Sequence, residues 1–167
     1  MTPEAELLLL HLKLLLLLGV ANGAPILGHR ILRQRFAQPL DGGARFLDGR
    51  PVFGPSKTLR GVALALGATP LAALVIGLDP YLGFVVGLYA MLGDLTSSFV
   101  KRRLGMPSSS QALGLDQIPE SLFPLLAVRT TLGLAASEIV LLVAVFLILE
   151  LAVSRVLFKL RLRDQPY

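Results

Sequence analysis

The sequence predicts an all-α integral membrane protein, a five-transmembrane-helix bundle with two cytoplasmic loops. Of its 167 residues, 54% are hydrophobic and only 16% are charged, whereas about a quarter of the residues in an ordinary soluble domain are charged. The mean hydropathy is +0.70. Apolar stretches close to the roughly 20 residues that a membrane-spanning helix needs recur along the chain. A soluble domain could not bury this much apolar surface, so we expect a membrane protein.

The predicted spans form a single membrane domain and are separated by polar loops. They cover residues 7–28, 61–79, 81–100, 118–134 and 135–158. The first span has no basic residues before it, so we interpret it as a retained helix and not as a signal peptide. The last two spans share one apolar run, which Arg129, Gly133 and the pair Ser137-Glu138 divide at a predicted turn.

Lysine and arginine predict the orientation, because these residues stay on the cytoplasmic side of a membrane. Seven lie in segment 29–60, three follow the third span in the loop 101–117, and four lie at the C-terminal end. These fourteen of the sixteen cations lie at one end of the predicted bundle. We therefore expect a multi-pass protein of the cell membrane with its N-terminus outside and its C-terminus inside.

Polar residues follow a glycine stripe on the third span. Gly83, Gly87, Ala90, Asp94, Ser97, Ser98 and Lys101 share one face of a 3.6-residue helix. The G-x-x-x-G spacing within the stripe allows two helices to approach closely in a membrane. A carboxylate at the edge of such a span indicates function, so Asp94 is predicted to face a site inside the bundle. The alternative is that Asp94 only forms an ion pair with Lys101 or Arg102.

A second carboxylate, Asp116, precedes the fourth span. It is either an N-cap for that helix, with Glu120 in the first turn, or the partner of Asp94 in holding a divalent cation. The chain has no cysteine and only two histidines, which excludes a thiolate nucleophile and a cysteine-based zinc site. A metal held by carboxylates would be Mg²⁺, Mn²⁺ or Ca²⁺.

The first loop combines a hairpin signal with cations at a helix start. Apolar residues flank the turn pair Asp48-Gly49. Lys57, Thr58 and Arg60 then lie at a helix start, just before the second span, where a helix N-terminus can bind phosphate. The alternative is that they only form a basic loop beside the membrane. In the first span, Pro25 predicts a kink near the cytoplasmic end, and Asn22 either lines the site or bonds within the bundle.

Four motifs together resemble the archaeal CDP-archaeol synthases, which are small five-span membrane cytidylyltransferases. They are "ANGAPIL", "DGRPVFGPSKTLRG", "GDLTSSFVKRRLG" and "GLDQIPES", in this order, over about residues 20–121. The pattern G-D-x-x-x-S-x-x-K-R at Gly93–Arg102 is shared with the wider group of phosphatidate cytidylyltransferases. Pro119 stands where that group has a second acid.

The resemblance implies that CMP is transferred from CTP to a membrane lipid phosphate, giving a CDP-archaeol-type lipid and pyrophosphate in phospholipid biosynthesis. The expected acceptor is unsaturated archaetidic acid, 2,3-bis-O-geranylgeranylglycerol 1-phosphate. The cofactor would be Mg²⁺ and the partners CTP, the lipid phosphate and membrane lipids, with no nucleic acid. The assigned roles are catalytic for Asp94, Lys101 and Asp116, metal-binding for Asp94 and Asp116, phosphate-binding for Lys57, Thr58, Arg60, Lys101 and Arg102, and supporting for Asn22, Asp48, Ser97 and Ser98.

Two alternatives remain at this point. A small transporter or channel also uses intramembrane acids and glycine-rich helices, but its polar residues would lie near the membrane midplane. A CTP-dependent lipid kinase would instead give phosphorylated lipid and CDP.

Overall fold

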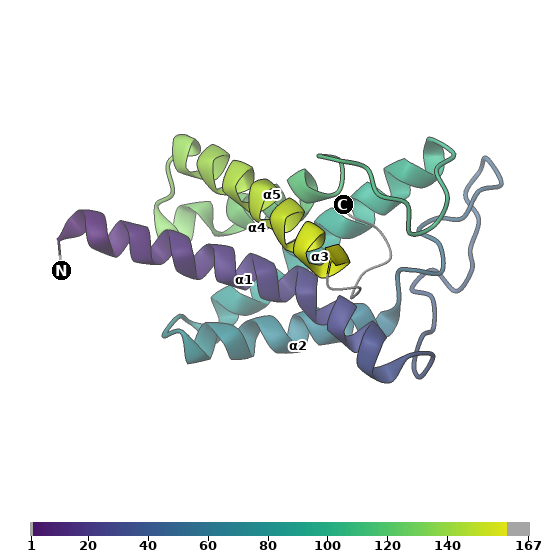
Figure 1. Ribbon diagram of the computed structural model, residues 1–167, viewed down its shortest axis with the longest axis horizontal. Helices are drawn as coiled ribbons and strands as arrows, with labels where there is room; N and C mark the ends of the chain where they lie inside the picture. Colours follow the sequence, from purple (N-terminus) through teal and green to yellow (C-terminus); the bar gives the residue numbers. More distant parts are fainter. Residues whose placement is uncertain (1, 160–167) are drawn as a thin grey trace.

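The computed structural model describes residues 2–159, with side chains as far as Arg155. The fold consists of helices packed side by side, as Figure 1 shows. They are α1 (Pro3–Leu32), α2 (Leu59–Val75), α3 (Pro80–Arg103), α4 (Gln117–Leu132) and α5 (Ala136–Lys159). Within the described residues there is no strand, and only two isolated β-bridges occur, both in the first loop. The all-helical membrane fold predicted from the sequence is confirmed.

Three segments are long and apolar enough to cross a membrane: α1, α3 and the part of α5 up to Arg155. Helix α2 is a shorter apolar helix of 17 residues. At 1.5 Å per residue it is about 26 Å long. Every helix begins and ends within about four residues of its predicted span; the largest differences are at both ends of α1, which is longer than predicted, and at the end of α2, which is shorter.

Successive helices run in opposite directions, so the connections gather at the two ends of the bundle (Figure 1). One end carries the N-terminus and the short links 76–79 and 133–135. The other end carries the long loops 33–58 and 104–116, and we call it the loop end. Both basic loops therefore lie together, as the charge pattern predicted. The predicted C-terminal cations Arg161 and Arg163, and the side chain of Lys159, lie outside the described residues.

The turn predicted between the last two helices is present. Gly133 follows α4 with a φ of 67°, a left-handed conformation that glycine adopts without a Cβ clash. The side chain of Glu138 then accepts a hydrogen bond of 2.7 Å from the backbone N–H of Ala135, which satisfies a free donor at the start of α5.

The apolar core lies away from the loop end. Buried leucines of α1 pack there against α4 and α5, and the cluster includes Leu14, Leu17, Leu18, Leu125, Val128, Leu142 and Phe146. Other large apolar side chains of the same helices stay exposed, among them Leu16, Leu126 and Val140. An exposed apolar periphery suits a bundle surrounded by lipid.

Two glycines of α3 let neighbouring helices approach closely. A Cβ at Gly83 would lie 2.6 Å from the Cβ of Ala73 on α2, which supports the predicted role of the glycine stripe. A Cβ at Gly93 would lie 2.2 Å from the backbone oxygen of Pro119. Helix α4 can thus begin against α3 only because residue 93 has no side chain.

The first loop folds back on the end of α3. Around the predicted turn pair Asp48-Gly49, the N–H of Phe46 donates to the carbonyl of Arg50 at 2.8 Å. Arg103 at the end of α3 forms an ion pair of 2.9 Å with Asp48 and stacks on the ring of Phe46 at 4.8 Å. Asp48 therefore fastens the hairpin to α3.

The second half of this loop depends on Asp41. Its carboxylate accepts hydrogen bonds from the N–H groups of Gly43, Phe53 and Gly54 at 2.9–3.0 Å. Partial burial would raise the pKa of Asp41, but the backbone hydrogen bonds outweigh it and hold the pKa below its ordinary value of 3.8.

We predict that this contribution to loop stability depends on acid. Because the pKa of Asp41 is lower in the folded loop than in the unfolded chain, the contribution is complete well above pH 3.8. It is lost as the pH falls through the lowered value. Hydrogen exchange at the amides of Phe53 and Gly54 should then accelerate beyond its intrinsic pH trend, and Asp41→Asn should remove this extra acid dependence. An identical pH profile in both proteins would contradict the assignment.

Candidate functional site

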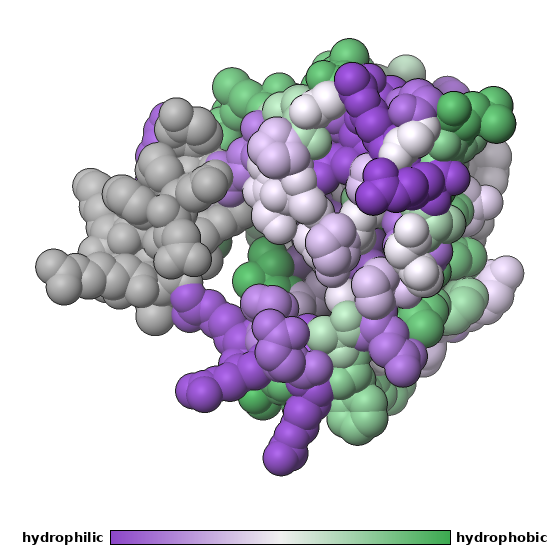
Figure 2. Space-filling model, turned by 90° about the vertical axis from the view of Figure 1, so that its right-hand side faces the viewer, coloured by the Kyte–Doolittle hydropathy of each residue, from purple (hydrophilic) through white to green (hydrophobic). Residues whose placement is uncertain are grey.

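A cavity of about 720 Å³ lies at the loop end of the bundle. Its walls come from all five helices and both long loops. Figure 2 views the molecule from the loop end and shows hydrophilic residues gathered over this face, with hydrophobic residues around the periphery. Most of the residues predicted for the site line this cavity: Asn22, Lys57, Thr58, Arg60, Asp94, Ser98, Lys101, Arg102 and Asp116.

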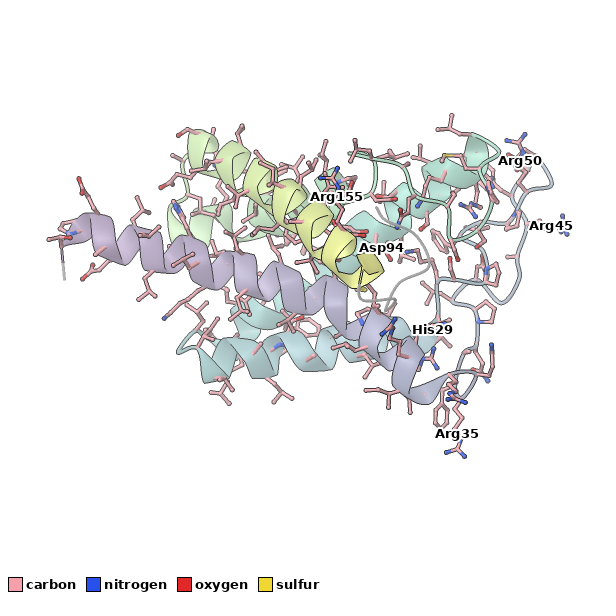
Figure 3. The ribbon with its side chains drawn as sticks, viewed as in Figure 1. His29, Arg35, Arg45, Arg50, Asp94 and Arg155 are labelled. Atoms are coloured by element: carbon pink, nitrogen blue, oxygen red, sulfur yellow. The ribbon has the colours of Figure 1, made fainter. Side chains whose placement is uncertain are left out.

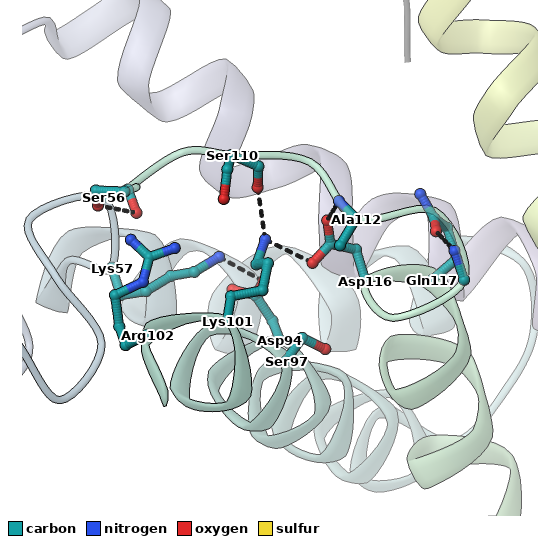
Figure 4. Close-up of polar contacts among 12 residues, drawn as sticks. Ser56, Lys57, Asp94, Ser97, Lys101, Arg102, Ser110, Ala112, Asp116 and Gln117 are labelled. Carbon is teal, nitrogen blue, oxygen red and sulfur yellow. Dashed lines mark hydrogen bonds and ion pairs between the residues drawn. The ribbon is translucent and has the colours of Figure 1, made fainter. Parts of the chain in front are cut away.

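Asp94 forms an ion pair that joins α3 to the first loop. It lies on α3, and its Oδ1 forms an ion pair with Nζ of Lys57, the residue next to the N-cap of α2 (Figure 4). Both side chains are about one-fifth exposed. The sequence left open an ion pair of Asp94 with Lys101 or Arg102. The structure shows the pair with Lys57 instead.

Lys101 forms the second pair. Its Nζ lies 2.6 Å from Oδ1 of Asp116 and donates to the carbonyl of Ser110 at 2.7 Å. The other carboxylate oxygen of Asp116 accepts a hydrogen bond from the N–H of Ala112 at 2.9 Å (Figure 4). Asp116 makes no capping bond to α4. Its side chain therefore reaches across to α3 and does not serve its own helix.

Arg102 and Arg60, which were also predicted to bind phosphate, donate to backbone carbonyls. Arg102 donates from Nη2 to the carbonyl of Pro107 at 2.7 Å. Arg60 donates from Nη1 to the carbonyls of Arg33, at 2.9 Å, and of Arg35. Arg60 therefore fastens the end of α1 to the start of α2.

The remaining predicted residues have local roles. Thr58 caps α2 by accepting from the N–H of Gly61 at 3.1 Å, and Asn22 donates to the carbonyl of Leu18 at 3.0 Å. Ser97 is fully buried and donates to the carbonyl of Gly93 at 2.9 Å. Asp48 and Ser97 are not among the residues that line the cavity.

Two acids that the sequence reasoning did not assign to the site also line the cavity, Glu120 and Glu150. Glu120 is only 7% exposed and lies within hydrogen-bonding reach of Asp94. The sequence signal for Glu150 was a carboxylate inside the apolar run of the last span, which by itself indicates function. Glu120 was assigned only to the first turn of α4.

The carboxylates suit Mg²⁺ in one particular mode. Among the described residues, no group of three acidic, histidine or cysteine side chains is placed to hold a metal ion alone. Asp94 and Glu120 lie close together beside the ammonium group of Lys57, and Asp116 lies beside that of Lys101. Mg²⁺ in nucleotide sites is commonly held by one or two carboxylates together with substrate phosphates and water. The acids of the cavity fit that mode.

Comparison with known proteins identifies the family. The family described as CarS-like, CDP-archaeol synthase, matches residues 74–167. A CDP-archaeol synthase of Pyrobaculum calidifontis is 37% identical over 153 residues, covering 89% of this chain and 91% of that protein. This chain belongs to the CDP-archaeol synthase family.

Further relatives of the family agree. The CDP-archaeol synthase of Pyrobaculum aerophilum is 34% identical over 89% of this chain and 92% of its own length. A solved structure of an intramembrane enzyme for archaeal membrane lipids biosynthesis is 33% identical and covers 84% of this chain and 90% of that one, with a TM-score of 0.68. The resemblance first suggested by four short motifs thus extends over most of the chain.

Proposed function

We propose that this chain is a CTP-dependent cytidylyltransferase that transfers CMP to a membrane lipid phosphate. The observation that carries the proposal is the cavity at the end of the membrane bundle, where Lys57 of the first loop pairs with Asp94 of α3 and Asp116 of the second loop pairs with Lys101 of α3. A phosphate oxygen of the lipid attacks the α-phosphorus of CTP, the bond from that phosphorus to the bridging oxygen breaks, and pyrophosphate leaves. Two anions must meet in this reaction, so neutralisation and positioning are the main requirements.

Lys57 and Lys101 neutralise part of the phosphate charge. In the structure, Lys57 and Lys101 are held by Asp94 and Asp116, which keeps their ammonium groups inside the cavity. When a triphosphate enters, the same ammonium groups can turn to its oxygens. Mg²⁺, held by Asp94 and Asp116 with the nucleotide phosphates, would supply further neutralisation of the triphosphate charge.

The expected acceptor is 2,3-bis-O-geranylgeranylglycerol 1-phosphate, and the product is a CDP-archaeol-type lipid. The name of the relatives, CDP-archaeol synthase, supports the archaeol-type product. The loop end would then face the cytoplasm, where CTP is made, and the fourteen cations at the predicted inner end support that orientation.

The purified protein with CTP, Mg²⁺ and a panel of lipid phosphates tests the proposal. We expect a CDP-lipid and pyrophosphate, identified by mass, with the ether-linked isoprenoid acceptor used best. Phosphorylated lipid and CDP would indicate the kinase alternative, and the absence of any product across the panel would contradict the proposal.

The two lysines should also be energetically coupled. We predict that Lys57→Ala and Lys101→Ala each raise the CTP concentration needed for half-maximal rate by about tenfold or more, the range expected for a charge-assisted phosphate contact. The double variant should lose less than the sum of the single losses, because both groups serve one ligand. Strict additivity with an unchanged CTP requirement would mean that the lysines only anchor the loops.

A further inference from the structure

One edge of the cavity is formed by the membrane helices α1 and α5. Ile26, His29 and Arg30 of α1 line this edge, with Leu151 of α5. We call it the α1 edge. Ile26 is 51% exposed on a helix whose exposed apolar side chains suit lipid. The cavity therefore reaches the membrane-facing surface of the bundle at this point.

The α1 edge lies at the depth of lipid headgroups. Helix α1 has 30 residues and is about 45 Å long at 1.5 Å per residue, which exceeds the roughly 30 Å of the hydrocarbon core. Its last turns, which include His29 and Arg30, therefore emerge among the headgroups at the loop end. Figure 3 shows His29 near this end of α1.

The cations of the cavity differ in whether they already have partners. Lys57 and Lys101 are held by carboxylates, and Arg60 and Arg102 donate to backbone carbonyls. Arg30 is exposed and lines the cavity. Among the residues that the structure describes, it forms no hydrogen bond or ion pair. Its guanidinium is therefore available to an anion without breaking an existing contact.

His29 is oriented by its neighbour. Its Nδ1 lies 3.4 Å from Nη2 of Arg60. A guanidinium can only donate, so Nδ1 accepts and the ring proton of a neutral His29 resides on Nε2. Arg60 also holds the carbonyls of Arg33 and Arg35, which fixes the end of α1. Nε2–H of His29 is left as a second donor beside Arg30.

We propose that Arg30, with His29 beside it, binds the phosphate of the lipid substrate at the α1 edge, where the lipid reaches the cavity from the membrane. The ligand class is a phosphate monoester on a lipid whose apolar chains remain against Ile26 and Leu151. The inference rests on the proposed function. It assigns Lys57 and Lys101 to the nucleotide and Arg30 to the lipid, while Arg60 and Arg102 hold backbone carbonyls.

The test compares Arg30→Ala with Arg30→Lys and with a matched control, Arg35→Ala. Arg35 is an exposed arginine at the same end of α1 that does not line the cavity, and its backbone carbonyl, which Arg60 uses, remains in the variant. We expect Arg30→Ala to raise KM for the lipid phosphate by about tenfold or more and to leave KM for CTP within about twofold. Arg30→Lys should recover part of the loss, and Arg35→Ala should resemble the parent.

A binding measurement without CTP separates the two proposals. Native mass spectrometry of the detergent-solubilised protein should show retention of the lipid phosphate over the same lipid lacking its phosphate, and Arg30→Ala should abolish the difference. If Arg30→Ala and Arg35→Ala lost lipid-phosphate binding equally, the effect would be a general attraction between basic residues and the anionic lipid, and the inference would be overturned. Unchanged lipid retention in Arg30→Ala would overturn it as well. An active parent with a normal Arg30→Ala variant overturns the subsite alone, whereas a parent inactive on every lipid phosphate overturns the proposed function.

Discussion

Asp94→Asn should lower kcat by at least about a hundredfold, equivalent to about 2.7 kcal/mol of barrier at 1.36 kcal/mol per tenfold. Asp94 holds Lys57 by an ion pair and lies within hydrogen-bonding reach of Glu120. The amide has nearly the same shape, but it neither pairs with the lysine nor offers a charged ligand to a cation. Turnover with saturating CTP and lipid phosphate measures the effect.

The matched control is Asp79→Asn, the same chemical change at the other end of α3. Asp79 caps that helix by accepting from the N–H of Tyr81 at 2.9 Å, and asparagine caps a helix equally well. This variant should keep the activity of the parent. An Asp94→Asn protein that is folded in the membrane and keeps more than a tenth of the parental rate would contradict the metal-binding role.

Gly93→Ala should give the largest loss of stability of any single methyl group added to the bundle. The new Cβ would lie 2.2 Å from the backbone oxygen and 2.4 Å from the backbone carbon of Pro119. Backbone atoms cannot swing aside as a flexible side chain can, so helix α4 must move away from α3. Overpacking of a well-packed core typically costs about 1–3 kcal/mol, and we expect this substitution to reach at least the upper end. Thermal unfolding in detergent measures it.

Gly67→Ala is the control for Gly93→Ala, because nothing lies within 4 Å of the added Cβ in the middle of α2. Replacing this glycine should leave stability unchanged or raise it by up to about 1 kcal/mol through helix propensity. Since Glu120 follows Pro119, Gly93→Ala should also move Glu120 away from Asp94 and reduce turnover below the unfolding temperature. Equal melting temperatures for the two alanine variants would contradict the close helix crossing.

The features that the sequence predicted correctly are local ones. The length of the apolar runs identifies the helices, and the 3.6-residue period places Asp94 and Lys101 on the face of α3 that lines the cavity. Gly133 and Glu138 mark a turn by their own backbone chemistry. Each of these properties depends on residues within a few positions in the chain.

The partners of the charged groups could not be predicted, because they join distant segments. Asp94 pairs with Lys57, 37 positions away, while the sequence offered only neighbours on the same helix. Arg60 was predicted to bind phosphate at a helix start, and in the structure its guanidinium donates to the carbonyls of Arg33 and Arg35 just after α1. Glu120 becomes part of the site because Gly93 lets α4 begin against α3. That crossing is a property of the packed bundle.

The central claim is that the cavity transfers the CMP part of CTP to a lipid phosphate. The most direct measurement is the fate of the label when the protein receives either α-labelled or γ-labelled CTP with the lipid phosphate. The account predicts that the α-label enters the lipid and the γ-label leaves as pyrophosphate, and that Asp94→Asn suppresses both. Transfer of the γ-label to the lipid, or α-label incorporation that Asp94→Asn leaves unchanged, would contradict it.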